Sequence, residues 1–170
     1  KAGDPVVINP YVNCGTCPAC LEGRPNCCET LKVIGVHADG GMADEIVIPA
    51  QNLYPADGIS LRDAAMVEFL AIGAHAIRRT AELKPGSRAL VVGSGPIGLG
   101  VAFFARVAGA DVTVVDAAPD KIEATRDLGF RTFSVADNEG GEFAAVRDTG
   151  FDAVFDATGF EPAVMLLLGI

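Results

Sequence analysis

The sequence contains no tryptophan and only two histidines, and its basic side chains are outnumbered by acidic ones, 13 to 22. The net charge of −9 argues against a nucleic-acid partner, because phosphates require a basic patch and the longest basic run is Arg78–Arg79. No apolar stretch is long enough to span a membrane, and the closing residues VMLLLGI are far too short. Because no secretory signal is visible either, we expect reduced thiols and a cytoplasmic location.

The cysteines are few but concentrated, since all five lie within residues 14–28. Cys14, Cys17, Cys20 and Cys28 form the pattern C-x2-C-x2-C-x7-C in a turn-rich stretch. Four thiolates at close spacing are the ligand set that tetrahedral zinc prefers. A closed four-sulfur shell leaves no open coordination position, so the pattern predicts a structural zinc ion that holds a loop.

Three other readings of the cysteines are open. A disulfide pair is disfavoured by the short C-x2-C steps and the missing export signal, and free buried thiols are disfavoured by the clustering. An iron–sulfur cluster is the main alternative metal centre. Cys27 and Cys28 are adjacent, so one of them is spare, and spacing alone favours Cys28 only weakly as the fourth ligand.

The first part of the chain predicts short strands, and the part after Ser60 predicts alternating strands and helices. The expected early strands are Val6–Asn9, Val33–Val36 and Glu45–Pro49. One helix is expected over Leu61–Leu83, with Ser60 as its cap. The expected later strands are Arg88–Gly93, Val112–Asp116, Arg131–Val135 and Asp152–Asp156, and the expected helices are Pro96–Ala108, Pro119–Leu128 and one from near Pro162.

This alternation predicts an α/β fold with a doubly wound parallel sheet of the Rossmann type, preceded by a smaller β-rich region. We expect a partial catalytic domain over 1–70, with the zinc lobe at 13–30, and a partial NAD-binding domain over 71–170. About four strands of a sheet that usually has six can be identified. We therefore expect that both ends of the chain cut through structural elements.

A glycine-rich turn follows the predicted strand that ends at Gly93 and opens the next predicted helix. The sequence G-x-G-x-x-G in this strand–turn–helix context predicts a dinucleotide site. The first glycine permits the tight turn, the second lets backbone amides approach a pyrophosphate, and the third allows close packing of helix and sheet. The candidate cofactor contacts are Gly93, Ser94, Gly95, Pro96, Ile97 and Gly98.

Asp116 ends the second predicted strand, where an acid accepts hydrogen bonds from the ribose hydroxyls. An acid there repels a 2′-phosphate, and Ala117 and Ala118 offer no arginine to bind one, so we expect NAD rather than NADP. The alternative is a glycine turn with a solvated Asp116. Lys121 is a candidate cofactor contact, or an ordinary exposed charge. Asp156 either lines the cofactor cleft, or Asp156 or Thr158 caps the last predicted helix.

Taken together, these motifs resemble the zinc-dependent medium-chain dehydrogenase/reductase family, the alcohol dehydrogenase superfamily. The resemblance rests on Gly3–Val6, the cysteine lobe with Gly23 and Asn26, the Gly93–Gly98 turn, the pair Asp116 and Lys121, and Asp156–Gly159. It covers essentially the whole chain, and it implies Cys28 as the fourth ligand. It further implies hydride transfer between NAD and a secondary alcohol or its ketone, in a homodimer or homotetramer.

The resemblance also implies a second, catalytic zinc ion. Its upstream ligands would lie before Lys1, and only its downstream ligand, Glu68, is expected within this chain. A glutamate at this position resembles the polyol, sugar-acid and threonine dehydrogenase branch, although Phe69 departs from the proline often found there. Glu68 lies in an apolar run, where a buried carboxylate is costly unless paired or metal-bound, and a helix-surface acid is the alternative.

The two histidines are not predicted to be metal ligands. His75 is expected to pack on the helix face of Glu68, and His37 is expected in a loop near the cleft. Two other functions stay open: a catalytically incomplete, zinc-stabilised NAD-binding module, and a zinc-independent reductase of the same superfamily.

Overall fold

The computed structural model describes residues 1–80, 83–135 and 141–168. The chain separates into two compact units, Lys1–Glu68 and Phe69–Ile170. None of the helices among the described residues is long and apolar enough to cross a membrane.

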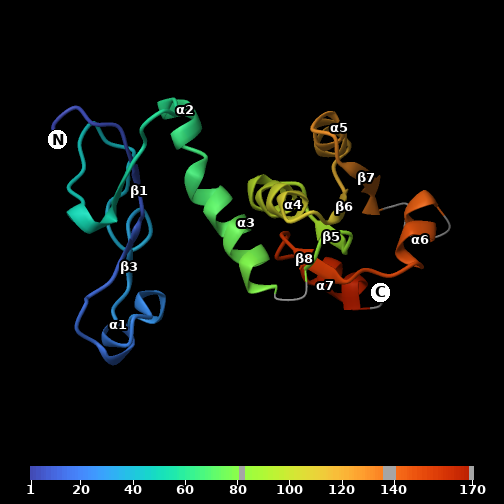
Figure 1. The fold of residues 1–170 in the computed structure, drawn as a ribbon, viewed down its shortest axis with the longest axis horizontal. Coiled ribbons are helices and arrows are strands. Elements are labelled where there is room, and N and C mark those ends of the chain that lie inside the picture. The colour runs from blue at the N-terminus through green and yellow to red at the C-terminus, as the bar shows by residue number, and fades with distance from the viewer. Residues whose placement is uncertain (81–82, 136–140, 169–170) are drawn as a thin grey trace. The chain divides into compact units, whose positions relative to one another are not determined.

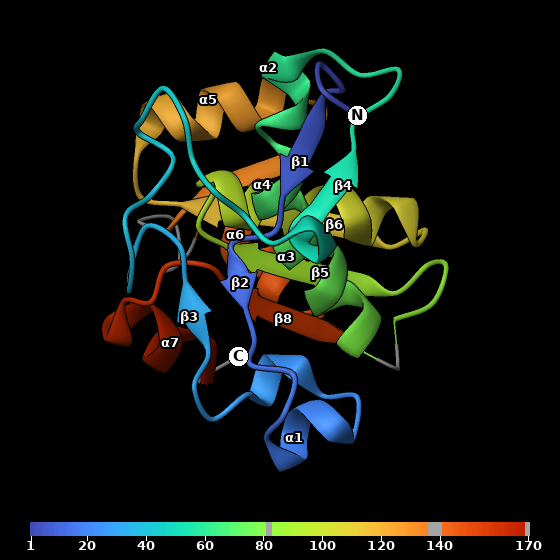
Figure 2. The ribbon, with the colours of Figure 1, turned by 90° about the vertical axis from the view of Figure 1, so that its left-hand side faces the viewer.

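Two small antiparallel ladders organise the first unit. Strand β1 (Val6–Ile8) pairs with β4 (Leu53–Pro55), and β2 (Tyr11–Val12) pairs with β3 (Lys32–Val33), as Figure 2 shows. The cysteines lie on the long connection from β2 to β3. The helical turns of this unit are α1 (Pro18–Leu21), η1 (Pro25–Cys27), η2 (Ala50–Asn52) and α2 (Leu61–Ala64).

The predicted strand Glu45–Pro49 is wrong, because these residues form no regular structure. Val47 is almost fully exposed, so the apolar alternation that suggested a strand has no surface to pack on here. The strand expected over Val33–Val36 is shorter and starts one residue earlier. It ends at Val33 because the chain turns at Gly35, whose φ of 88° is one that glycine adopts easily.

The second unit contains a parallel sheet with strand order β7-β6-β5-β8. Its strands are β5 (Arg88–Val92), β6 (Asp111–Asp116), β7 (Arg131–Ser134) and β8 (Ala153–Asp156). The predicted α/β fold with a parallel sheet is confirmed. From β5 the sheet is extended on one side by β6 and β7 and on the other side by β8, so the strand order changes direction between β5 and β8. A sheet of this kind binds ligands beyond the carboxyl ends of its strands at that point.

Helices cover both faces of this sheet. Side chains of α3 (Val67–Arg79) and α4 (Pro96–Val107) pack on one face with Ala89 and Val91 of β5. Leu90 and Val92 pack on the other face with side chains from α6 (Glu142–Arg147) and α7 (Glu161–Leu168). Figure 1 shows α4 and α5 (Pro119–Asp127) on the upper side of the sheet, α7 below it and α6 to its right. Helix α6 was not predicted from the sequence pattern.

The single helix predicted over Leu61–Leu83 is wrong as one element, since α2 ends at Ala64 and α3 runs from Val67 to Arg79. Ser60 does cap α2, because its hydroxyl accepts a hydrogen bond from the Asp63 amide at 3.1 Å. Apolar spacing alone cannot reveal such a break. Glycines let α3 and α4 meet closely: a Cβ on Gly73 would lie 2.3 Å from the carbonyl carbon of Gly100.

Candidate functional site

The four cysteines of the predicted zinc site converge. The Sγ atoms of Cys14, Cys17, Cys20 and Cys28 all lie within 4.8 Å of one another. Cys17 precedes α1 and Cys28 follows η1, so two short helical turns bring the sulfurs together. Cys27, the neighbour of Cys28, is exposed and is not part of the group.

Backbone amides point at these sulfurs. The amides of Thr16 and Cys17 donate to Cys14 Sγ at 3.4 and 3.3 Å, and the amide of Cys14 donates to Cys28 Sγ at 3.3 Å. The Thr16 hydroxyl and the amides of Thr16 and Cys17 lower the pKa of the Cys14 thiol to about 5. The Cys14 amide lowers the pKa of Cys28, whereas burial raises the pKa of Cys20 to about 11.

The cysteine group fits a tetrahedral metal ion. Zinc–sulfur bonds of about 2.3 Å place four sulfurs about 3.8 Å apart, so a small contraction of the group would complete the shell. Amide donors favour the thiolate form that binds the metal. The donor set, four cysteine sulfurs, matches zinc. The four sulfurs would fill all four positions of the tetrahedral shell, so no coordination position would stay open.

The buried side-chain amide of Asn52 hydrogen-bonds the backbone segment that leads into the cysteine lobe. Asn52 is 3% exposed, and its Nδ2 donates to the carbonyl oxygens of Asn9 and Tyr11, each at 2.9 Å. Asn9 and Tyr11 flank Pro10, where the chain leaves β1 for β2. This role could not be predicted from the sequence, because asparagine is common in ordinary turns.

The glycine turn connects β5 to α4. Gly93 has a φ of 95°, and Gly95 precedes the first turn of α4 with open space where a Cβ would be. A Cβ on Gly98 would lie 1.8 Å from the carbonyl oxygen of Gly93. The turn therefore presents free space at Gly95 and a helix N-terminus, the arrangement that accommodates a pyrophosphate. Pro96 and Ile97 form the start of α4.

Asp116 lies at the carboxyl end of β6, beside this turn. Its Oδ2 accepts hydrogen bonds from the amide and the hydroxyl of Ser94, at 2.7 and 2.8 Å, and its Oδ1 accepts one from the Ala118 amide at 2.9 Å. Partial burial raises the pKa of Asp116, but these donors and the positive charge of Lys121 outweigh it and leave the pKa below its ordinary value. The carboxylate is therefore ionised at neutral pH.

The Asp156 carboxylate accepts hydrogen bonds within its own turn, so its oxygens are not both open to a ligand. Its Oδ1 accepts from the amide and hydroxyl of Thr158, at 3.0 and 2.6 Å, and its Oδ2 accepts from the Gly159 amide at 3.2 Å. These bonds lower the pKa of Asp156, the Thr158 hydroxyl most of all. These bonds close the turn that follows β8 and involve no residue of α7, which begins at Glu161, so through them Asp156 does not cap that helix. The turn packs against the glycine turn, since a Cβ on Gly93 would meet Thr158 Cγ2 at 2.9 Å.

Glu68 and the two histidines are not among the four ligands of the cysteine group. Glu68 is half-buried in the first turn of α3 and belongs to none of the metal-ligand groups found among the described residues. The expectation that His75 packs against its helix is wrong: the side chain is exposed and its Nδ1 lies 3.3 Å from Arg78. His37 lies in a turn, where its Nδ1 accepts from the Val33 amide at 2.9 Å.

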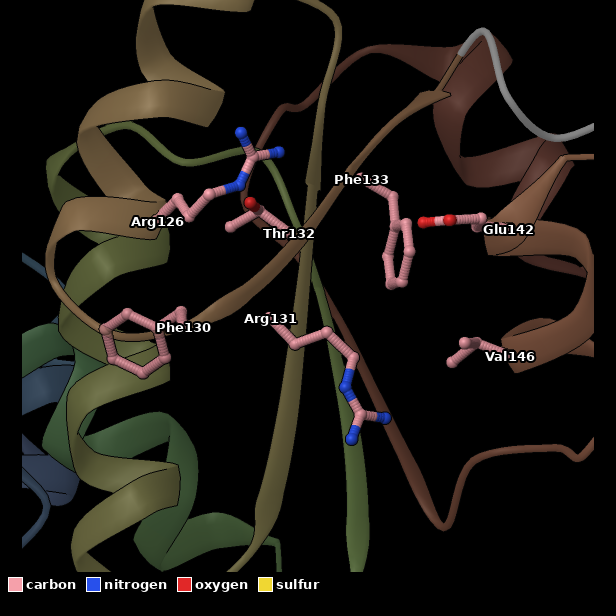
Figure 3. Close-up of a pocket in the computed structure, with 7 residues that line it drawn as sticks. All are labelled: Arg126, Phe130, Arg131, Thr132, Phe133, Glu142 and Val146. Carbon is pink, nitrogen blue, oxygen red and sulfur yellow. The ribbon is translucent and has the colours of Figure 1, made fainter.

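A cavity of about 650 Å³ lies around the edge strand β7, away from the glycine turn. Figure 3 shows that its polar side chains do not converge, because Arg126 and Arg131 point in different directions. Thr132 contributes a buried hydroxyl for which no partner is found among the described residues. A binding site needs several polar groups aimed at one place, so this cavity is not the candidate.

Known proteins resemble this chain over nearly all its length. The profile of the Alcohol dehydrogenase GroES-like domain matches residues 1–58. L-galactonate-5-dehydrogenase of Escherichia coli K12 is 46% identical over 96% of this chain and 49% of its own length. D-altritol 5-dehydrogenase of Agrobacterium fabrum is 36% identical over 99% of this chain and 50% of its own length. The chain belongs to the zinc-type alcohol dehydrogenase superfamily.

Solved structures of the superfamily share the fold. An alcohol dehydrogenase from Escherichia coli CFT073, complexed with NADH, superposes with a TM-score of 0.82 at 29% identity, over 93% of this chain and 48% of the other. The chain spans about half the length of the curated relatives it matches. The predicted fold class, a GroES-like region before a Rossmann-type sheet, is confirmed by these matches.

Proposed function

We propose that this chain is part of an NAD-dependent zinc dehydrogenase that oxidises a secondary alcohol of a polyol or sugar acid to the ketone. The observation that carries the proposal is the meeting of the glycine turn with Asp116 at the carboxyl ends of β5 and β6. The names of the relatives support the substrate class, because a 5-dehydrogenase of a galactonate or an altritol acts on an internal, secondary hydroxyl.

The residues of the second unit bind and orient the cofactor. The free amides at the start of α4 would hold the pyrophosphate, and the open space at Gly95 would let it approach. Asp116 would accept a ribose hydroxyl, and its charge would repel the 2′-phosphate of NADP. Lys121 lies in the first turn of α5 and acts on Asp116 electrostatically, which supports a contact of Lys121 with the same ribose. When bound, NAD accepts the hydride from the carbinol carbon of the substrate.

The first unit supplies the metal-binding residues. Cys14, Cys17, Cys20 and Cys28 would hold a structural zinc ion and fold the lobe between β2 and β3. Glu68 would contribute to the catalytic zinc site, either as a direct ligand or by holding the metal-bound water. The protein would act as a homodimer or homotetramer, with a small alcohol or ketone as the partner of the site.

The test combines zinc content, cofactor binding and turnover on the purified full-length protein of verified mass, because we expect this chain alone, with only Glu68 of the catalytic zinc ligands, to be inactive. We expect at least one zinc per chain, tighter binding of NADH than of NADPH, and NAD reduction with a polyol or an aldonate such as L-galactonate. Glu68→Ala should abolish turnover while the zinc of the cysteine lobe and NADH binding stay. Undiminished polyol oxidation by that variant would remove Glu68 from the mechanism.

The same experiment separates the alternatives. A protein that binds one zinc and NADH but oxidises none of the alcohols would be the zinc-stabilised NAD-binding module. A protein that reduces substrates with its metal removed would be the zinc-independent reductase. The intact cysteine group favours neither of these over the zinc dehydrogenase, whereas the relatives favour the dehydrogenase.

A further inference from the structure

The second residue of the glycine turn, Ser94, is almost fully buried although it carries a hydroxyl. It is 5% exposed, and both its amide and its hydroxyl donate to one oxygen, Oδ2 of Asp116. The glycine pattern requires no particular side chain at this position. This chain therefore places a second donor where the backbone alone would supply one.

The contacts of Asp116 limit what it can still accept. A carboxylate offers about four acceptor positions on its two oxygens. Ser94 occupies two on Oδ2, and the Ala118 amide occupies one on Oδ1. One position is left on Oδ1 for a ligand, and the carboxylate is held from both sides so that it cannot rotate freely.

We propose that Ser94 is a positioning residue for cofactor selectivity: its hydroxyl locks the Asp116 carboxylate with Oδ1 turned to the adenosine ribose. This inference rests on the proposed NAD function. A locked carboxylate loses no rotational freedom when a ribose hydroxyl binds, and its charge stays in place against a 2′-phosphate. A carboxylate free to turn would bind NADH less well and would reject NADPH less strongly.

The test is to titrate the wild type and Ser94→Ala with NADH and with NADPH, and to measure each Kd from the change in fluorescence. The alanine keeps the backbone amide and removes only the hydroxyl. We expect the Kd for NADH to rise roughly five-fold and the preference for NADH over NADPH to fall by at least as much, in keeping with the loss of one charge-assisted hydrogen bond. Ser94→Thr, which keeps a hydroxyl, should retain more of the preference than Ser94→Ala.

Two controls separate positioning from general damage. Ser87→Ala removes a hydroxyl at the opposite end of β5, where it accepts from the Lys84 amide, and should leave both Kd values unchanged. In an Asp116→Asn background, Ser94→Ala should no longer change the NADH preference, because the charge that it positions is gone. A purely structural role for Ser94 would give the same loss in both backgrounds.

The outcomes distinguish this inference from the proposed function. If the wild-type protein binds neither NADH nor NADPH, the proposed function fails. If the wild type prefers NADH and Ser94→Ala binds both cofactors as the wild type does, only the role of Ser94 is overturned. Tighter NADH binding by Ser94→Ala would also overturn it, because the hydroxyl would then compete with the ribose.

Discussion

Only four residues of Lys1–Glu68 are buried, whereas the second unit holds two clusters of buried apolar side chains. The four are Cys28, Asn52, Ala56 and Ala64. The strands of the first unit are two or three residues long, and those of the second are four to six. A region with so little apolar surface to bury needs another source of stability. In the second unit it is the packing of helices on a sheet, and in the first a zinc ion held by the cysteine group would supply it.

Metal removal should therefore produce the largest difference between the two units, measured as protection of backbone amides from hydrogen exchange. With a chelator present, we expect the amides of the cysteine lobe, residues 13–30, to lose their protection from hydrogen exchange. Structural zinc supplies on the order of 10 kcal/mol of folding free energy in small domains. The amides of β5 and β6 should keep their protection, because their partners are strands and buried side chains. Equal loss in both units would contradict the comparison.

The adjacent cysteines offer a matched pair of variants. Cys28→Ser should reduce zinc affinity by about 100-fold or more, because a buried ligand of the group is lost. Cys27→Ser should leave zinc affinity unchanged, because Cys27 is exposed and lies outside the group. Zinc per chain after dialysis, with a colorimetric competitor, measures both. A loss of zinc in Cys27→Ser alone would exchange the roles of the two residues.

Two glycines of the turn should separate stability from binding in the second unit. Gly98→Ala forces a Cβ against the carbonyl oxygen of Gly93 and should destabilise the unit by about 3 kcal/mol. Gly95→Ala has open space and a φ of −69°, so it should leave the melting temperature nearly unchanged. It should instead weaken NADH binding by about ten-fold, because the added methyl group faces the pyrophosphate. Thermal unfolding and an NADH titration of both variants check the pair.

The smallest effect concerns pH. The folded-state pKa of Asp116 is depressed below its usual 3.8, so its stabilisation of the second unit is fully present above about pH 4 and is lost as the pH falls through the folded value. Wild type should therefore exceed Asp116→Asn in stability at pH 6, and the difference should shrink towards pH 3. Urea unfolding at several pH values measures it. A difference that grows as the pH falls would reverse the assigned sign.

Much of the second unit could be predicted from the sequence, because its signals are local. Buried strands of apolar residues, glycines at helix ends and the turn at Gly93–Gly98 each act through neighbours in the chain. Errors arose where distant contacts decide. Glu45–Pro49 alternates like a strand but pairs with no strand in the part of the chain that the structure describes, and the helix expected from Leu61 breaks between Ala64 and Val67.

The same difference between local patterns and distant contacts applies to the candidate sites. Short spacing predicted that Cys14, Cys17 and Cys20 form a group with Cys27 or Cys28, because ligand chemistry is a property of residue type, and the family resemblance favoured Cys28. The contact of Ser94 with Asp116 could not be predicted from local spacing, since 22 residues separate them and β5 must lie beside β6 for the two to meet. The close approach of Gly73 and Gly100 was decided in the same way, because such contacts depend on packing geometry that no local pattern encodes.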